Sequence, residues 1–313
     1  ITAVRWANLL QESGHEVQLA REYQSGDFDC LVALHARHSQ PSLIRFHQKI
    51  PGARIVVCLT GTDLHIDFDP ANRQSEDSQL LAHYAAVQQS LDIADQIVLL
   101  EPVGQRKLPE HLHSKCHIIR QSAEAVANPL PLPDDYFLVT VVGHLRPVKD
   151  PFRTAAAARL LPPESRIRIM HIGNALSSEM ETAAKAESDD NDRYEWIGGV
   201  SHDEAMRKLA SSHLTVLSSL HEGAPSVISE AIVNRIPVLA TKIDATIGML
   251  GADYPGLFEV GDTQRLAELM HQAETEPEFL EQLREAVYDL APQFSINREL
   301  EAWKSVFKSS AVK

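Results

Sequence analysis

Short apolar runs alternate with helical segments along almost the whole 313-residue chain, and this alternation limits the possible folds more than any other feature. The runs predict strands at 16–19, 30–34, 54–59, 95–100, 116–120, 137–142, 166–172, 194–197, 213–218, 237–240 and 257–260. Most are continuous stretches of Val, Ile and Leu, which is typical of strands buried on both faces of a parallel sheet. Helices are expected between them, notably at 73–93, 151–161, 201–211, 225–235 and 263–290. The predicted class is therefore α/β, with doubly wound parallel sheets.

Two lobes are expected, because the length and one proline-rich segment both indicate a division. A domain takes roughly 150 residues, so the chain is long enough for two. Residues 127–135, ANPLPLPDD, contain three prolines and should be extended and unable to continue a helix or a strand. We therefore expect an N-terminal Rossmann-like lobe over 1–126 and a C-terminal Rossmann-like lobe over 136–294. The carboxyl ends of their sheets should face each other across a cleft.

Both ends of the chain are predicted to be helical. Residues 1–15 are amphipathic from the outset, whereas an α/β domain normally opens on a strand, so the first strand of the N-terminal lobe is expected to be missing. The final segment, 295–313, is expected to form a helix that docks either on the N-terminal lobe or on its own lobe. Its apolar face carries Ile296, Leu300, Trp303 and Phe307.

The composition indicates a cytoplasmic protein that handles small molecules. A net charge of -14 argues against nucleic acids and anionic membranes as partners. No apolar run reaches the ~18 residues of a membrane span, and no signal peptide opens the chain. The three cysteines, Cys30, Cys58 and Cys116, are far apart, which favours a reducing compartment and packing as small hydrophobic side chains. The oligomeric state is left open.

The loop after the strand at 213–218 carries the first group of candidate site residues. In SSLHEGAPSVISEAIVNRIPV, Glu222 and Glu230 flank Gly223 and Pro225. Pro225 is placed to start a helix, whose free backbone amides and positive dipole end favour a phosphate or a sugar hydroxyl. Gly223 allows the backbone to approach a ligand closely. An ordinary capped helix with exposed acids would show the same spacing.

The loop after the strand at 137–142, GHLRPVKDP, carries the second group. Gly143 permits a tight turn at the end of the strand, and His144, Arg146 and Lys149 bring cations together. A local cluster of cations in an acidic chain suits an anionic phosphate. The equal alternative is a solvated loop whose Lys and Arg side chains point outward.

Together the two loops resemble the donor motifs of the family 4 glycosyltransferases. GHLRPVKD is similar to the G-R-L-x-x-x-K-G loop of that family, and EGAPSVISE matches its E-x7-E motif. The resemblance implies the GT-B fold, in which two Rossmann-like lobes face a cleft, and a nucleotide-sugar donor. It implies that His144 and Lys149 hold the donor diphosphate, that Glu222 contacts the transferred sugar, and that Glu230 binds the ribose.

The same resemblance implies that the amides of Gly223 and Ala224 face the sugar and the phosphate. Such enzymes need no divalent metal at the donor phosphate, so no metal and no cofactor besides the UDP-sugar co-substrate is expected. Glu222, Lys149 and Arg146 are the predicted catalytic residues, the two cations stabilising charge on the departing diphosphate.

The sequence departs from the family pattern at two positions. His144 replaces the usual Arg, so a permanent charge becomes pH-dependent unless Arg146 takes its place. Arg235 stands where a helix-ending Gly is usual, so that turn must end differently or accept local strain.

A narrower resemblance covers nearly the whole chain. The segments TAVRWANLL, ALHARHS, LTGTDL, GHLRPVKDP, SEAI and IGMLGADYPGLFEVGDT are similar to those of the selenosugar synthases of selenoneine biosynthesis. The resemblance implies transfer of a hexose or N-acetylhexosamine from UDP-glucose or UDP-N-acetylglucosamine to selenophosphate, which forms a carbon–selenium bond and releases UDP. The alternative is a family 4 enzyme with a conventional sugar or small-molecule hydroxyl acceptor. Two further alternatives on a two-lobed fold are a sugar-binding protein without enzymatic activity and a nucleotide-sugar epimerase.

Two N-terminal loops form the candidate acceptor site. ALHARHS and LTGTDL each follow a predicted strand, and they offer His35, Arg37, Thr60, Gly61, Thr62 and Asp63. Hydroxyls, a glycine amide and cations suit a small oxyanion such as selenophosphate. Asp63 would repel an anion unless it orients a neighbouring base, and a helix N-cap made with Thr62 is nearly as good an interpretation. His35 and His38 have HxxH spacing, but no third ligand is in view, so no metal is expected.

Overall fold

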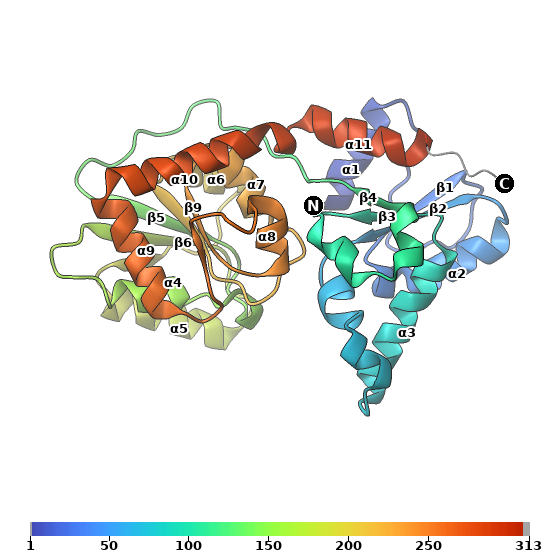
Figure 1. The fold of residues 1–313 in the computed structure, drawn as a ribbon, viewed down its shortest axis with the longest axis horizontal. Helices are drawn as coiled ribbons and strands as arrows, with labels where there is room; N and C mark the ends of the chain where they lie inside the picture. Colours follow the sequence, from blue (N-terminus) through green and yellow to red (C-terminus); the bar gives the residue numbers. More distant parts are fainter. Residues whose placement is uncertain (1, 309–313) are drawn as a thin grey trace. The chain divides into compact units, whose positions relative to one another are not determined.

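The computed structural model describes residues 2–308, and the chain divides into two compact α/β units (Figure 1). The first unit comprises residues 1–121 together with the C-terminal segment from residue 296, and the second comprises residues 122–295. None of the described helices combines the length and the apolar character that crossing a membrane requires.

The division between the units falls earlier than the proline-rich segment at 127–135. Two contacts attach the preceding residues to the second unit: the amide of Ala123 donates to the carbonyl of Phe294 at 3.2 Å, and that of Val126 to Asn234 Oδ1 at 2.8 Å. Residues 127–135 form no helix or strand, as predicted, but hydrogen bonds upstream of them show where the second unit begins.

The first unit is built on a four-stranded parallel sheet in the order β1-β2-β3-β4. The strands are β1 Cys30–Leu34, β2 Arg54–Leu59, β3 Gln96–Leu99 and β4 Cys116–Ile118. The helices are α1 Thr2–Glu12, α2 Ala36–Lys49, α3 Ser78–Ile93 and α11 Ile296–Lys308, with shorter helical segments η1 Asp63–Asp67, η2 Pro70–Gln74, η3 Val103–Lys107 and η4 Glu110–Lys115. Phe46, Ile55 and Ile97 are fully or almost fully buried at its core, as apolar strand runs require.

Helix α11 packs against α1 in the first unit. The indole rings of Trp6 and Trp303 meet edge to face with centroids 4.9 Å apart. The carboxylate of Glu299, which is 1% exposed, accepts hydrogen bonds from Trp6 Nε1 at 2.7 Å and from the guanidinium of Arg5 at 2.5 Å. The predicted apolar face is therefore partly wrong: Ile296 is exposed, whereas Glu299 is buried because two donors on α1 satisfy its charge.

The second unit is built on a six-stranded parallel sheet in the order β10-β9-β8-β5-β6-β7. Its strands are β5 Phe137–Val142, β6 Ile167–Ile172, β7 Tyr194–Trp196, β8 Leu214–Leu217, β9 Val238–Thr241 and β10 Leu257–Phe258. Its helices are α4 Arg153–Ala158, α5 Ser178–Asp190, α6 His202–Ala210, α7 Ser226–Val233, α8 Asp244–Leu250, α9 Thr263–Thr275 and α10 Pro277–Leu290, with short turns η5 Pro147–Lys149 and η6 Ala291–Phe294. The chain runs outward from β5 to one edge and then from β8 to the other.

Two of the predicted elements are wrong. Residues 16–19 form no strand, because no strand among residues 2–308 pairs with them, and Leu19 is 52% exposed. The helical stretch at 263–290 is two helices, since Pro277 cannot donate a backbone hydrogen bond and starts α10 instead.

The cysteines behave as the sequence predicts. Cys58 is buried in β2, and burial raises the pKa of the Cys30 thiol to about 12 and that of Cys116 to about 11. All three remain protonated thiols at neutral pH and pack as small apolar groups.

Candidate functional site

The loops after β5 and β8 lie side by side because those two strands are neighbours where the strand order reverses. Ligands of open parallel sheets bind outside the carboxyl ends of the strands at such a point. We call residues 143–149 and 219–230 the second-unit loops. They contain every residue that the sequence predicts for the donor.

An ion pair joins the two second-unit loops. Lys149, the last residue of η5, donates from Nζ to Glu222 Oε1, and the Ser219 hydroxyl donates to the same oxygen at 2.7 Å. The side chains of Lys149 and Glu222 are 21% and 13% exposed, so the pair is largely shielded from water. Two residues predicted to contact different parts of one ligand thus form an ion pair with each other.

Helix α7 begins at Ser226, directly after Pro225, as predicted. Its first turn therefore presents free backbone amides beside Gly223 and Ala224. Glu230 lies in the second turn with a side chain 13% exposed, and the exposed imidazole of His202 lies 3.9 Å from its carboxylate. Burial raises the pKa of Glu230, and the charge of His202 opposes that shift. A buried carboxylate with so little compensation is suited to accept hydrogen bonds from a ligand.

Backbone contacts between glycine loops hold Gly143 in place. A Cβ atom on Gly173, in the loop after β6, would lie 2.1 Å from the carbonyl oxygen of Gly143, so the two turns approach too closely for any side chain. Beneath them, His171 Nε2 donates to that same carbonyl at 3.1 Å, while its Nδ1 accepts from the Tyr194 hydroxyl at 2.9 Å. Burial lowers the pKa of His171 to about 4, so it is a neutral, fixed donor.

The remaining cations of the second-unit loops differ in how they are held. His144 accepts the backbone N–H of Asn174 at its Nδ1, 3.0 Å away, so this ring faces the loop after β6. Arg146 is exposed. The prediction that Arg146 takes the place of the family's cation at residue 144 therefore stays a prediction, with Arg146 exposed and His144 turned toward the loop after β6.

Arg235 accepts the strain that its position in the sequence predicts. Its φ is 58°, in the left-handed region, and the amides of Arg235 and Ile236 close the end of α7 on the carbonyls of Ile232 and Ala231. Its guanidinium stacks over the Tyr288 ring at 4.6 Å, a contact that glycine would lack.

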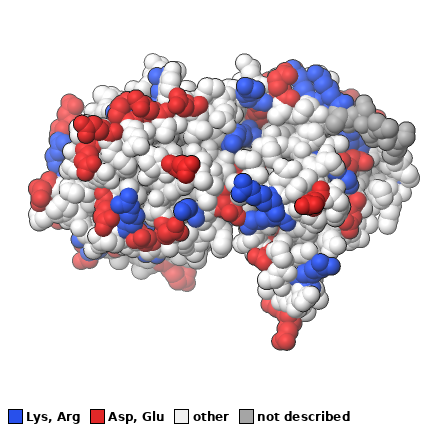
Figure 2. Space-filling model, in the orientation of Figure 1, with Lys and Arg blue, Asp and Glu red and all other residues white. Residues whose placement is uncertain are grey.

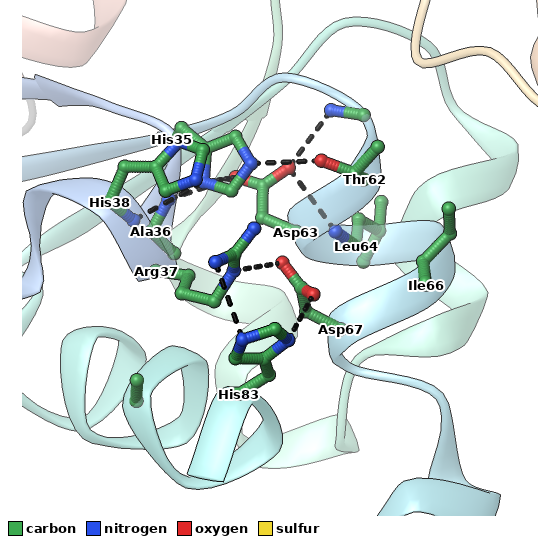
Figure 3. A network of polar contacts seen from close by, with 12 residues as sticks. His35, Ala36, Arg37, His38, Thr62, Asp63, Leu64, Ile66, Asp67 and His83 are labelled. Atoms are coloured by element: carbon green, nitrogen blue, oxygen red, sulfur yellow. Dashed lines mark hydrogen bonds and ion pairs between the residues drawn. The ribbon is translucent and has the colours of Figure 1, made fainter. Parts of the chain in front are cut away.

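In the first unit, a buried carboxylate organises the ends of β1 and β2. Asp63 is 0% exposed and accepts four backbone amides, those of Ala36, Thr60, Gly61 and Leu64, at 2.9–3.2 Å (Figure 3). The prediction that Asp63 lines the acceptor site is therefore wrong, since no part of it reaches the surface. It is not an N-cap either; it joins residues 35–38 to residues 60–67, which we call the first-unit loops.

His35, next to the Ala36 amide that Asp63 binds, has a strained backbone conformation. His35 has a φ of 69°, which is uncommon for a residue with a side chain and occurs most often at functional sites. Its Nδ1 accepts the amide of His38 at 3.4 Å, so its Nε2 carries the proton and donates to Thr62 Oγ1 at 2.9 Å. The Thr62 hydroxyl hydrogen has no acceptor among residues 2–308, which leaves it available to a ligand. The His38 ring stacks on His35 at 3.9 Å.

Arg37 is tied into a ring of three side chains from three elements (Figure 3). Its Nε donates to Asp67 Oδ2 at 2.7 Å; His83 Nδ1 lies 3.3 Å from the other Asp67 oxygen, and His83 Nε2 lies 3.4 Å from Arg37 NH1. The sequence analysis did not single out Asp67 or His83. The available signal was an acid and a histidine in the segment that follows LTGTDL, which is weak without the fold.

The face drawn in Figure 2 carries no broad basic area. On the face drawn in Figure 2, Lys and Arg are interspersed with Asp and Glu over each unit. Anion binding would therefore rest on the loops themselves rather than on long-range attraction.

The family follows from comparison with known proteins. Residues 122–290, more than half of the chain, match the model of the family described as glycosyl transferases group 1. The chain belongs to this family. Among curated relatives, the putative teichuronic acid biosynthesis glycosyltransferase TuaC of Bacillus subtilis (strain 168) is 25% identical over 195 residues, which make up 61% of this chain and 48% of TuaC. This group 1 glycosyltransferase chain thus spans about half the length of the curated relative it matches.

Solved structures share the fold of this group 1 family member. Anabaena HepE in complex with UDP-glucose has a TM-score of 0.69 at 18% identity, over 90% of this chain and 79% of HepE. Sucrose-phosphate synthase of Thermosynechococcus elongatus has a TM-score of 0.69 at 17% identity, over 90% of this chain and 75% of that protein. The predicted α/β class with two parallel-sheet lobes of the GT-B type is confirmed.

Proposed function

We propose that the protein transfers a hexose or N-acetylhexosamine from a UDP-sugar to selenophosphate, with the donor on the second-unit loops and the acceptor on the first-unit loops. The observation that carries the donor half is the Lys149–Glu222 pair beside the start of α7, at the point where the strand order of the sheet reverses. Family membership and the UDP-glucose bound to HepE support the same reading.

The donor diphosphate would displace Glu222 from Lys149. A diphosphate carries more charge than a carboxylate, and the amides at the start of α7 add donors that Glu222 does not use. Lys149 and Arg146 then stabilise the charge that develops on the leaving diphosphate, while the freed Glu222 accepts a hydroxyl of the transferred sugar. Glu230 accepts the ribose hydroxyls. In this scheme the two cations do the work of a divalent metal, and no metal is required.

The acceptor would be a small tetrahedral oxyanion. The Thr62 hydroxyl and the guanidinium of Arg37 offer donors at the ends of β1 and β2, and His35 orients Thr62. The amides of Thr60 and Gly61 are engaged by Asp63, so these two residues, predicted to bind the acceptor, shape the loop instead. With Asp63 buried, its negative charge is already engaged by four amides and does not line this site. Selenophosphate is anionic, so it needs no strong general base of the kind an alcohol requires.

The transfer balances without an oxidant or reductant. Selenium attacks the anomeric carbon through a lone pair, the bond from that carbon to the diphosphate oxygen breaks, and its electron pair leaves with UDP. Water then cleaves the selenium–phosphorus bond and yields the selenosugar and phosphate.

A conventional hydroxyl acceptor is the second candidate, and its support is the likeness to TuaC. That likeness is weak support for any particular acceptor, because the match covers 48% of TuaC and could reflect a shared type of donor alone. The first-unit loops favour an oxyanion instead, because an anion matches the positive charge of Arg37 and a neutral sugar does not.

The test is UDP release. The protein is incubated with UDP-glucose or UDP-N-acetylglucosamine, with and without selenophosphate, and products are followed by mass spectrometry. Selenophosphate-dependent UDP and a selenium-containing sugar are expected. UDP released only with an alcohol acceptor overturns the selenophosphate assignment, and no UDP with any acceptor overturns the transferase assignment.

A further inference from the structure

The ring of Arg37, Asp67 and His83 has a donor arrangement that closes in only one way. Asp67 is 4% exposed at its side chain and accepts from Arg37 Nε, while His83 Nδ1 lies 3.3 Å from its other oxygen in an ion-pair contact. Because Arg37 NH1 can only donate, the proton of a neutral His83 ring lies on Nδ1. The Nε2 of His83 is then a lone pair, which accepts from Arg37 NH1 at 3.4 Å. Each side chain thus restrains the next, and both ring nitrogens of His83 contact other members of the cluster.

This closure bears on Arg37, because a guanidinium recognises an oxyanion only when its planar fork points at it. Asp67 fixes Nε, and His83 fixes NH1, which leaves NH2 of Arg37 as the edge without a partner among residues 2–308. With only one anchor the guanidinium would swing about its side-chain torsions and lose rotamer entropy on binding. With two anchors that entropy is already lost before the acceptor arrives.

We infer that His83 is a positioning residue for the acceptor: in its Nδ1–H form it completes the ring that aims the free edge of Arg37 at a tetrahedral oxyanion. The inference rests on the proposed function for the identity of that oxyanion. His83 itself touches no reacting atom. Its side chain comes from α3, the Asp67 carboxylate from η1 and the guanidinium from α2, so the orientation of one cation depends on three elements meeting.

Substitution of His83 separates this role from a purely structural one. His83→Ala removes both contacts and is expected to raise the KM for selenophosphate about tenfold, the loss of roughly one charge-assisted hydrogen bond, with kcat and the KM for the UDP-sugar nearly unchanged. His83→Asn keeps an N–H close to the position of Nδ1 and is expected to recover part of that loss through Asp67. His47→Ala, at an exposed histidine of α2, is the matched control and should match wild type.

A double-mutant cycle tests whether His83 acts through Arg37. Arg37→Ala alone should raise the selenophosphate KM further than His83→Ala does, and Arg37→Ala/His83→Ala should equal Arg37→Ala. Competitive inhibition by inorganic phosphate should weaken in the same order. Melting temperatures within a few degrees of wild type show that these variants fold.

The outcomes distinguish the inference from the function beneath it. A wild-type protein that turns over selenophosphate, together with a His83→Ala variant of unchanged acceptor KM, overturns the role of His83 and leaves the reaction standing. Additive effects in the cycle overturn the route through Arg37. A wild-type protein that releases no UDP with any acceptor overturns the proposed reaction itself.

Discussion

The second-unit loops and the first-unit loops are both proposed to bind an anion, but different kinds of contact hold them in place. The second-unit loops rely mainly on the backbone, with glycine turns in contact and the amides at the start of α7, and add the ion pair between Lys149 and Glu222. The first-unit loops use buried side-chain networks centred on Asp63 and Asp67. The proposed donor site can therefore be encoded within short motifs, whereas the proposed acceptor site requires residues brought together by the fold.

The largest effect is expected from a substitution that changes the second-unit loops alone. Lys149→Ala should lower kcat/KM about 1000-fold, because it removes a charged donor from the leaving diphosphate, and it should weaken UDP binding measured by calorimetry. Lys185→Ala, at an exposed lysine paired with Glu181, is the control. If Lys149→Ala binds UDP as wild type does, the donor site has been misplaced.

The next largest effect is expected from a substitution that changes the first-unit loops alone. Asp63→Ala leaves four buried amides without an acceptor and should lower the free energy of unfolding by about 3 kcal/mol, measured in urea. Asp63→Asn, which keeps one carbonyl acceptor, should cost less. UDP affinity should be unchanged in both folded variants, because the second-unit loops do not share this network. Loss of UDP affinity in a folded Asp63 variant would contradict the separation of the two sites.

A smaller effect depends on pH. Burial raises the pKa of Glu230, so the folded protein holds that proton more tightly than the unfolded chain does. The stability linked to Glu230 is complete below its unfolded pKa and is lost as pH rises through its folded pKa. Glu230→Gln should therefore be more stable than wild type at neutral pH, by about 1 kcal/mol, and the difference should shrink on acidification.

Unfolding curves of wild type and Glu230→Gln at several pH values measure this difference. The same variant should bind UDP more weakly, since an amide accepts fewer hydrogen bonds from a ribose than a carboxylate does. A stability difference that is constant with pH would contradict the assignment of the buried charge.

The smallest effect compares strained residues in the two units. His35→Gly relieves the strain of a φ of 69°, but it loses the hydrogen bonds of the ring to the His38 amide and Thr62 and the stacking on His38, so the free energy of unfolding should fall by about 1 kcal/mol. It should also lower turnover by releasing Thr62. Arg235→Gly gains similar relief but loses the stacking on Tyr288, so its stability should stay nearly the same, with turnover unaffected. Thermal melts and UDP release measure both, and equal effects of the two changes on turnover would argue against a functional role for the strain at His35.

The same contrast explains how much could be predicted from the sequence. β2 and β5 begin and end where their apolar runs do, because a strand that is buried on both faces has a continuous run of apolar residues. The bounds of β1 are also those predicted, although β1 is only partly buried. Helix α7 starts after Pro225 for a similarly local reason.

The failures involve partners distant in the chain. Residues 16–19 have the composition of a strand, but a strand needs a neighbour. Asp63 looked like a surface ligand because sequence cannot reveal that Ala36 donates to it from another loop. His83 escaped notice because its meaning comes from Arg37 and Asp67, far from it in the chain.

Helix α11 gives the chain an order of assembly. The first unit takes its sheet from the first 121 residues but completes its packing only with Trp303 and Glu299. A ribosome therefore delivers every residue of the second unit before the last helix of the first. During synthesis, the second unit is able to fold while the Trp6 face of the first unit remains exposed until α11 has been made.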